Sequence, residues 1–215
     1  MKEQKVTIEN QGQKIVGILH KSDKANDKLV ILVTGFTGTM KGSGGIFIKL
    51  AKRLCKNGFD VFRFNFRFTT WDWSLYQNMT IKEEVSDLKK IISTMGKKYQ
   101  KIGILGGSMG GAVSILSYND KVDAMVFWYP SIFLSETDLK DKFPSKDKLK
   151  ELENKGYIIY KKYGKDIKIG KNFVDEIRSL NLVPFLKKIE SPILSVHGDK
   201  DQSVPIDQSI KLMKF

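Results

Sequence analysis

The stretch that decides the fold is KIGILGGSMGGAVSIL, residues 101–116. It opens with KIGILG, an apolar run of the length of a buried strand, and from residue 109 onward its composition is typical of a helix. A strand that turns sharply into a helix needs small residues where the two elements pass close together, and Gly106 and Gly110 stand at those positions. The stretch therefore predicts a strand, a tight turn and a helix, with Ser108 at the turn.

The flanking sequence repeats this alternation of strands and helices. Apolar runs predict strands at 29–33, 60–66, 122–128 and 192–197, and apolar residues at helical spacing predict helices at 46–55 and 81–95. Near the N-terminus, QKVTIEN and KIVGILH flank QGQ and predict an antiparallel hairpin. The sequence thus predicts an α/β fold with a mostly parallel central sheet and helices on both faces.

Residues 131–180 break this rhythm after the sixth strand. They are rich in lysine and aromatic residues, and YIIYKKYGKDIKIG (157–170) predicts a short hairpin. We interpret 131–180 as a cap or lid insertion, and 1–130 with 181–215 as the core domain. The aromatic residues of the insertion either line a site for an aromatic group or form a small core of their own.

Composition narrows the range of partners. The 215 residues carry a net charge of +13, but the lysines are spread along the whole chain, which favours a solvated surface and predicts no nucleic-acid partner. The single cysteine, Cys55, excludes an intrachain disulfide and lies on an apolar helical stripe, so we expect it to be a packing residue. No apolar run reaches the length of a membrane span and no leader peptide is recognisable, which predicts a cytoplasmic protein without a membrane partner.

Cofactor and metal sites are not predicted. Two histidines and one cysteine, widely separated in the sequence, do not form a ligand cluster. The glycines at 106–111 match neither a dinucleotide fingerprint nor a phosphate-binding loop.

The turn at Ser108 points to nucleophilic chemistry. GGSMG, residues 106–110, matches the G-x-S-x-G nucleophile elbow, in which the serine hydroxyl is exposed above the sheet edge. A nucleophilic serine needs N–H donors for the oxyanion, and we expect them from the backbone of Met109 and, in the loop TGFTG (34–38), of Phe36. The alternative interpretation is a glycine-rich turn that only packs a helix on a strand.

Several motifs together resemble a known superfamily. LVTGFTG, IKEEVSDLKKII, IGILGGSMGG, MVFWYPS and SPILSVHGDKDQSVP are similar to segments of α/β-hydrolases in the serine-aminopeptidase-like and feruloyl (cinnamoyl) esterase-like group. The similarity runs from about residue 14 to the last residue and implies the α/β-hydrolase fold with a catalytic triad. It also implies that the second aspartate of HGDKD, Asp201, is the acid of the triad; Asp199 is the alternative.

The base of such a triad is not found in the usual place. A triad histidine should follow the acid, but residues 202–215 read as a single helix, and the only histidines are His20 and His197. We therefore expect the last strand, the histidine loop and the final helix of the fold to be missing, by natural truncation or because the chain is a fragment. His20 belongs to the early hairpin and is expected to be structural. His197 is the remaining candidate base, although in relatives it supports the HGDKD turn.

These observations predict a serine hydrolase that acts on small-molecule carboxylic esters, or on amides, and that is weakly active as a 215-residue chain. The alternative is a non-catalytic or truncated α/β-hydrolase-fold protein that binds a ligand or a partner. Acyl transfer by the same serine is a third hypothesis.

The expected truncation predicts self-association. A sheet without its last strand and helix exposes an edge and an apolar patch, both of which favour association. We expect poor solubility or oligomers in static light scattering of the purified chain; a monodisperse monomer would contradict this prediction.

Overall fold

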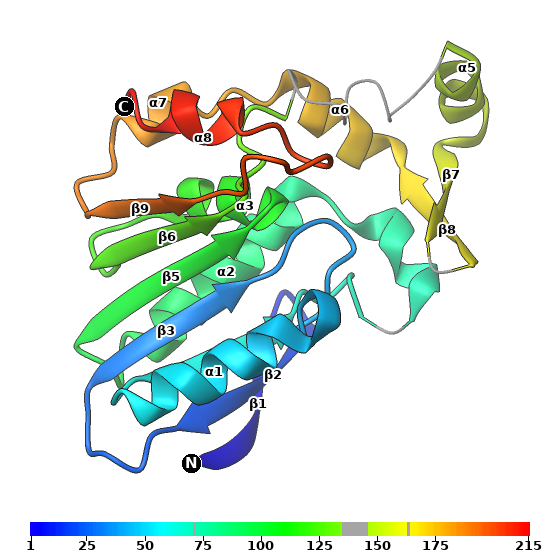
Figure 1. Cartoon of the computed structure of the whole chain (residues 1–215). Coiled ribbons are helices and arrows are strands. Elements are labelled where there is room, and N and C mark those ends of the chain that lie inside the picture. Colours follow the sequence, from blue (N-terminus) through cyan, green and yellow to red (C-terminus); the bar gives the residue numbers. More distant parts are fainter. Residues whose placement is uncertain (71, 135–145, 163) are drawn as a thin grey trace.

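A seven-stranded sheet runs through the centre of the computed structural model, which describes residues 1–70, 72–134, 146–162 and 164–215 (Figure 1). Its strands are, in chain order, β1 (Lys2–Asn10), β2 (Gln13–Lys21), β3 (Lys28–Val33), β4 (Asp60–Asn65), β5 (Lys101–Gly107), β6 (Ala124–Trp128) and β9 (Ile193–Val196). Across the sheet their order is β1-β2-β4-β3-β5-β6-β9. β2 pairs antiparallel with β1 and β4, and all other neighbours are parallel. The predicted mostly parallel sheet with an N-terminal hairpin is confirmed.

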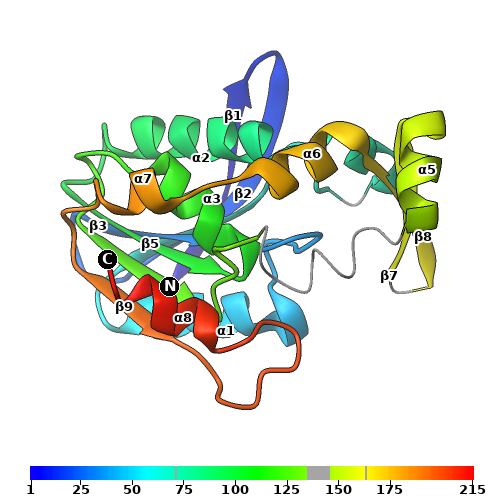
Figure 2. The same ribbon diagram turned by 90° about the horizontal axis from the view of Figure 1, so that it is seen from above.

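Helices cover both faces of this sheet, as Figure 2 shows. On one face, α1 (Ile46–Lys56) packs through a cluster that includes Phe47 and Cys55. On the opposite face, α2 (Ile81–Met95) and α3 (Met109–Ser117) bury a larger apolar cluster. Cys55 is a buried packing residue as predicted, and burial raises the pKa of its thiol to about 11.

Local sequence signals set the ends of these helices. Thr80 caps the N-terminus of α2: its hydroxyl accepts a hydrogen bond of 3.0 Å from the N–H of Glu83, the first half of a capping box. Asn57 caps the C-terminus of α1, and Gly58 then adopts a φ of 85°, which glycine tolerates without steric cost.

After β6 the chain leaves the sheet and forms a separate unit. β7 (Tyr157–Lys162) and β8 (Lys165–Gly170) make the antiparallel hairpin that the sequence predicted, and Figure 1 shows it beside α5, to one side of the main sheet. Within the described ranges, four further helices accompany this unit or follow it: α5 (Lys146–Lys155), α6 (Lys171–Ser179), α7 (Val183–Leu186) and α8 (Asp207–Leu212). The short helices η1 (Ser43–Gly45) and η2 (Trp73–Asn78) belong to loops of the core.

The hairpin contacts the core through η2. β8 packs on η2 so closely that a Cβ added to Gly170 would lie 2.3 Å from the carbonyl oxygen of Gln77. Residues 135–145 of the predicted insertion lie outside the described residues, and the domain boundaries at 130 and 181 stay predictions.

β9 forms one edge of the described sheet. Its side chains alternate, so that Ile193 and Ser195 are partly covered whereas Leu194 and Val196 are 57% and 48% exposed. The register places Leu194 beside Val126 and Val196 beside Trp128, residues that pack on the α1 side of the sheet. On that side the apolar surface of β9 is thus open to solvent.

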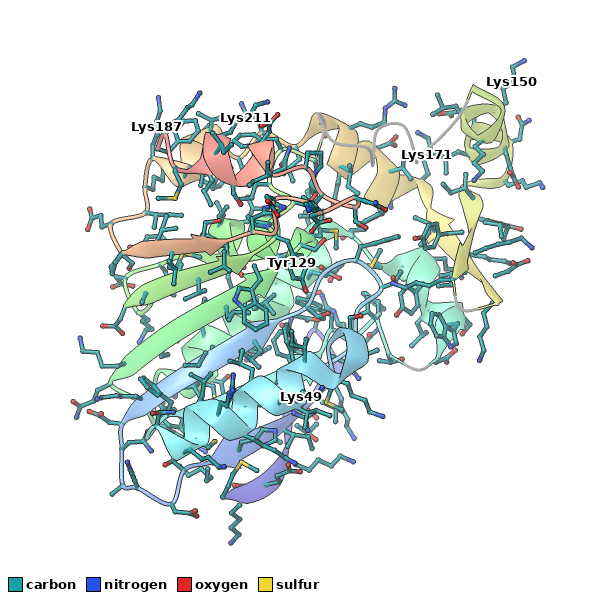
Figure 3. All side chains as sticks on the ribbon, in the orientation of Figure 1. Lys49, Tyr129, Lys150, Lys171, Lys187 and Lys211 are labelled. Atoms are coloured by element: carbon teal, nitrogen blue, oxygen red, sulfur yellow. The ribbon has the colours of Figure 1, made fainter. Side chains whose placement is uncertain are left out.

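Several lysines lie at one end of the molecule. Of the five that Figure 3 labels, Lys150, Lys171, Lys187 and Lys211 lie on or next to α5, α6, α7 and α8 along the upper edge of the view, and Lys49 lies on α1. None of the helices in the described ranges is long and apolar enough to cross a membrane.

A carboxyl group is buried on the α2 side of the core. Glu84 is 2% exposed, and neither oxygen of its carboxyl group has a hydrogen-bond partner among the residues that the structure describes. Burial, and secondarily the charge of Asp87, raises the pKa of Glu84 well above its ordinary value. The folded protein therefore holds this group neutral at pH values where the unfolded chain ionises it.

This burial predicts that Glu84→Gln stabilises the protein at neutral pH. The pKa of Glu84 is higher in the folded protein than in the unfolded chain, so the contribution of this group to the free energy of unfolding is greatest below about pH 4.5. Above that pH the contribution falls by about 1.4 kcal/mol per pH unit until the pH reaches the pKa of the folded state. Glutamine does not titrate, so urea unfolding should show a larger gain for Glu84→Gln at pH 8 than at pH 4. Glu9→Gln, on the exposed side of β1, is the control. An equal effect of Glu84→Gln at both pH values would contradict the prediction.

Candidate active site

Ser108 lies at the predicted turn between β5 and α3. Its backbone has φ 53° and ψ −128°, a conformation that residues with a Cβ rarely adopt. Hydrogen bonds on both sides hold the turn: the N–H of Ser108 donates to the carbonyl of Trp128 (3.0 Å), and its carbonyl accepts from Gly111 (2.9 Å) and Ser131 (3.0 Å). A strained residue that its surroundings hold so firmly is a common feature of functional sites.

The glycines around Ser108 are required by close packing. A Cβ on Gly106 would lie 2.7 Å from the carbonyl oxygen of Gly110. One on Gly110 would lie 2.6 Å from the carbonyl oxygens of Val33 and Thr34, at the end of β3. α3 can therefore approach β3 and β5 only because these two positions have no side chain, as the sequence predicted.

The turn and the TGFTG loop are brought together. A Cβ on Gly35 would lie 2.9 Å from the Cβ of Ser108 and 3.3 Å from the backbone nitrogen of Met109. Met109 is the first residue of α3, where backbone N–H groups have no intrahelical acceptor and the helix dipole favours negative charge. The two predicted oxyanion donors, Met109 and Phe36, thus belong to segments in contact beside Ser108.

A cavity of about 570 Å³ opens above this turn. Ser108 lines it together with Thr37 and Tyr129, which also have positive φ angles of 54° and 37°. Aromatic walls come from Phe36, Phe47, Trp73 and Tyr129. The volume is within the usual range for small-molecule sites, and three strained residues converge on it.

Asp201 lies in the turn after β9. Its Oδ1 accepts hydrogen bonds from the N–H groups of Ser203 (2.8 Å) and Val204 (3.0 Å). Ser203 lines the cavity, and the charge of Asp201 adds to burial in raising the pKa of Tyr129, another cavity residue. Asp201 is therefore close to the cavity but not among its lining residues. The alternative acid, Asp199, is exposed.

His197 is held inside the HGDKD turn. Its Nε2 lies 2.9 Å from the carbonyl oxygen of Val204, and its Nδ1 lies 2.7 Å from the Oγ of Ser209 in α8. A carbonyl only accepts, so Nε2 carries the proton and Nδ1 accepts from the hydroxyl. With both nitrogens engaged and the side chain 3% exposed, this geometry favours a structural role over that of a base for Ser108.

His20 is buried in β2, on the antiparallel side of the sheet. Its Nε2 accepts a hydrogen bond of 2.6 Å from Nε of Arg63, and its Nδ1 lies 3.3 Å from the carboxylate of Glu3. Burial, and secondarily the charge of Arg63, lowers the pKa of His20. Its burial and its contacts favour the structural role that we expected from its position in the hairpin.

Sequence reasoning did not single out Tyr129 or Lys162, which also line the cavity. Tyr129 directly follows β6, at the carboxyl end of a parallel strand, where sites in such sheets gather; this signal was available in the sequence. Trp73 and Lys162 come from η2 and β7. Nothing in the sequence distinguishes Lys162 from the other lysines of its hairpin.

The sheet order and the strained serine turn after β5 define an α/β-hydrolase. The model of the BD-FAE family matches residues 18–215. The chain therefore belongs to the BD-FAE family.

Individual relatives agree with this assignment. The chain is similar to the serine hydrolase BPHL of Homo sapiens, with 27% identity over 132 residues, which is 55% of this chain and 45% of the human protein. It therefore spans less than half the length of this curated relative. Among solved structures, it is similar to Est1E from Butyrivibrio proteoclasticus with bound ferulic acid (TM-score 0.81, 20% identity, 97% of this chain and 84% of that one). It is also similar to the esterase Pf2001 of Pyrococcus furiosus (TM-score 0.66, 21% identity, 99% and 76%). The structural similarities confirm the α/β-hydrolase fold.

The close packing at Gly110 predicts that Gly110→Ala is destabilising. The added methyl group would meet two backbone carbonyls that cannot rotate away, so we expect a loss of roughly 1–3 kcal/mol in the free energy of unfolding. Gly198→Ala is the matched control, because a Cβ there meets nothing within 4 Å. Urea unfolding of both variants makes the comparison, and equal stabilities would contradict the packing argument.

Proposed function

We propose that the chain is a serine hydrolase of carboxylic esters in which Ser108 is the nucleophile. The observation that carries this proposal is the strained Ser108 turn, which lies beside the Gly35–Phe36 loop and lines a cavity. In this proposal the N–H groups of Phe36 and Met109 bind the oxyanion, and Asp201 is the acid that orients and stabilises an imidazole.

The reaction proceeds in two stages. The Oγ of Ser108 bonds to the ester carbonyl carbon and gives up its proton, and the carbonyl oxygen becomes an oxyanion. When this intermediate collapses, the bond to the alkoxy oxygen breaks, the alcohol leaves with a proton, and an acyl-serine remains. Water then attacks the acyl-serine in the same way, releasing the carboxylic acid and restoring Ser108.

The proton of Ser108 needs an acceptor, and the two histidines are not placed to provide one. His20 is buried in β2, and both nitrogens of His197 are engaged within its turn. A serine without an adjacent base is a weak nucleophile, and the oxyanion hole and substrate binding by themselves accelerate hydrolysis on the order of 10³–10⁴-fold over water. We therefore propose slow turnover by these 215 residues acting alone.

The substrate class follows from the cavity walls. Four aromatic side chains line the cavity, and aromatic rings favour other flat, apolar groups. Est1E, which has a similar fold, binds ferulic acid, an aromatic carboxylic acid. We propose that the substrate of this chain likewise carries an aromatic group on one side of the ester.

A second candidate function is binding without chemistry. The engagement of both His197 nitrogens favours it, because the cavity would then receive a ligand with no base to complete a triad. The two functions differ in whether Ser108 forms an acyl intermediate.

Ester hydrolysis and its rescue by imidazole test the proposal. We expect slow release of 4-nitrophenol from 4-nitrophenyl acetate, faster with added imidazole, which supplies the missing base. The rates are compared after the protein-free reaction has been subtracted. Ser108→Ala should then lower both rates to background. Ser93→Ala, on the exposed side of α2, should leave them unchanged. Mass spectrometry should detect an acetyl group on Ser108. If Ser108→Ala leaves the rates unchanged, the binding function is favoured instead.

A further inference from the structure

The lining of the cavity is basic. Two lysines, Lys41 and Lys162, belong to it, and no aspartate or glutamate does among the residues that the structure describes. The remaining polar lining consists of hydroxyl and backbone groups, which carry no net charge. A substrate with a negative charge is therefore favoured in this cavity over a neutral one.

Lys162 lies next to the loop that faces Ser108. Its Nζ is 3.5 Å from the carbonyl oxygen of Phe36 and contacts the Oγ1 of Thr37. The preceding residue of that loop, Gly35, approaches Ser108 itself. The ammonium group thus lies at the cavity wall that the loop at residues 35–38 forms.

The hairpin directs Lys162 to this wall. Residues alternate between the two faces of a strand, so neighbouring lysines of β7 point in opposite directions. Lys161 is 84% exposed and lies 3.4 Å from Asp166 on β8, whereas Lys162 is half-buried at the cavity. Because Lys162 is half-buried, its ammonium group is partly desolvated, and this burial lowers its pKa.

Aromatic packing holds the hairpin and the loop together. The ring of Phe36 stacks on Phe173 at 5.2 Å and meets the edge of Tyr160 at 5.3 Å, both from the segment after β6. Tyr160 and Lys162 are two residues apart on β7 and so share one face of the strand. This packing therefore fixes the part of β7 that carries Lys162 against the loop that contains Phe36.

We propose that Lys162 is a specificity-determining residue that binds a carboxylate on the substrate, so that the preferred substrates are half-esters of dicarboxylic acids. This inference rests on the proposed function, since it assigns a substrate class to the same site. The ester carbonyl is bound between Ser108 and the loop, and the distal carboxylate of the acyl chain pairs with the Lys162 ammonium. A charge-assisted hydrogen bond at a partly desolvated site gives strong discrimination against an uncharged acyl chain.

Two substrates of equal chain length test the proposal. Mono-4-nitrophenyl adipate and 4-nitrophenyl hexanoate share the leaving group and differ in the terminal carboxylate. We expect a higher kcat/KM for the adipate, and we expect the ratio of the two values to fall roughly ten- to hundredfold in Lys162→Met. Lys162→Arg, which keeps the charge, should retain most of the preference.

Lys161→Met is the matched control. It removes a lysine from the adjacent position of the same strand, but one that points away from the cavity and pairs with Asp166. Its substrate ratio should equal that of the unmodified chain. If Lys161→Met lowers the ratio as much as Lys162→Met does, the preference comes from general surface charge and the proposal is wrong.

Binding separates this inference from the proposed function. Calorimetric titration of the Ser108→Ala chain with monomethyl adipate, and with methyl hexanoate at its solubility limit, needs no turnover. Tighter binding of the adipate that is lost in Ser108→Ala/Lys162→Met supports the carboxylate site even if no ester is hydrolysed. Equal binding of the two esters, or a preference that survives Lys162→Met while circular dichroism shows the variant folded, overturns it.

Discussion

The site depends on one steric constraint, the close crossing of α3 over the ends of β3 and β5. At Gly110 the helix backbone is so near the carbonyl groups of Val33 and Thr34 that no side chain fits. This approach forces the chain into the strained conformation of Ser108 and brings the start of α3 beside Gly35. The Ser108 turn, the N-terminus of α3 and the loop at residues 35–38 therefore meet at the same packing contact.

Backbone strain is concentrated around the resulting cavity. Ser108, Thr37 and Tyr129 all have positive φ angles, and such conformations cost on the order of 1–3 kcal/mol each. Hydrogen bonds across the sheet edge offset this cost. The N–H of Ser108 donates to the carbonyl oxygen of Trp128 at 3.0 Å, and the N–H of Tyr129 donates to the carbonyl oxygen of Val196 at 2.8 Å. Adjacent strands thus hold the turns in one geometry, which is what a preorganised site requires.

The segment after β6 completes the cavity from outside the core. Its aromatic rings pack on Phe36, and Lys162 reaches the backbone of the same residue. The sequence left two roles open for the aromatic residues of this segment, a small core or a wall of the site. Tyr160 and Phe173 combine the two, because their rings form a core with Phe36 and Phe36 itself lines the cavity. This segment supplies Lys162, one of the two lysines of the cavity lining, and in the proposed function it therefore contributes to substrate choice.

The sequence alone determined the features that depend on local sterics and on periodicity. Apolar runs located the strands, glycine spacing located the turn at Ser108, and the HGDKD motif located the turn that contains His197 and Asp201. Only the tertiary structure decided that both nitrogens of His197 are engaged by Val204 and Ser209, and that Lys162 reaches a loop 126 residues earlier in the chain. Periodicity shows which face of a strand a side chain occupies, but not what that face meets, because the packing of distant segments is a property of the whole fold.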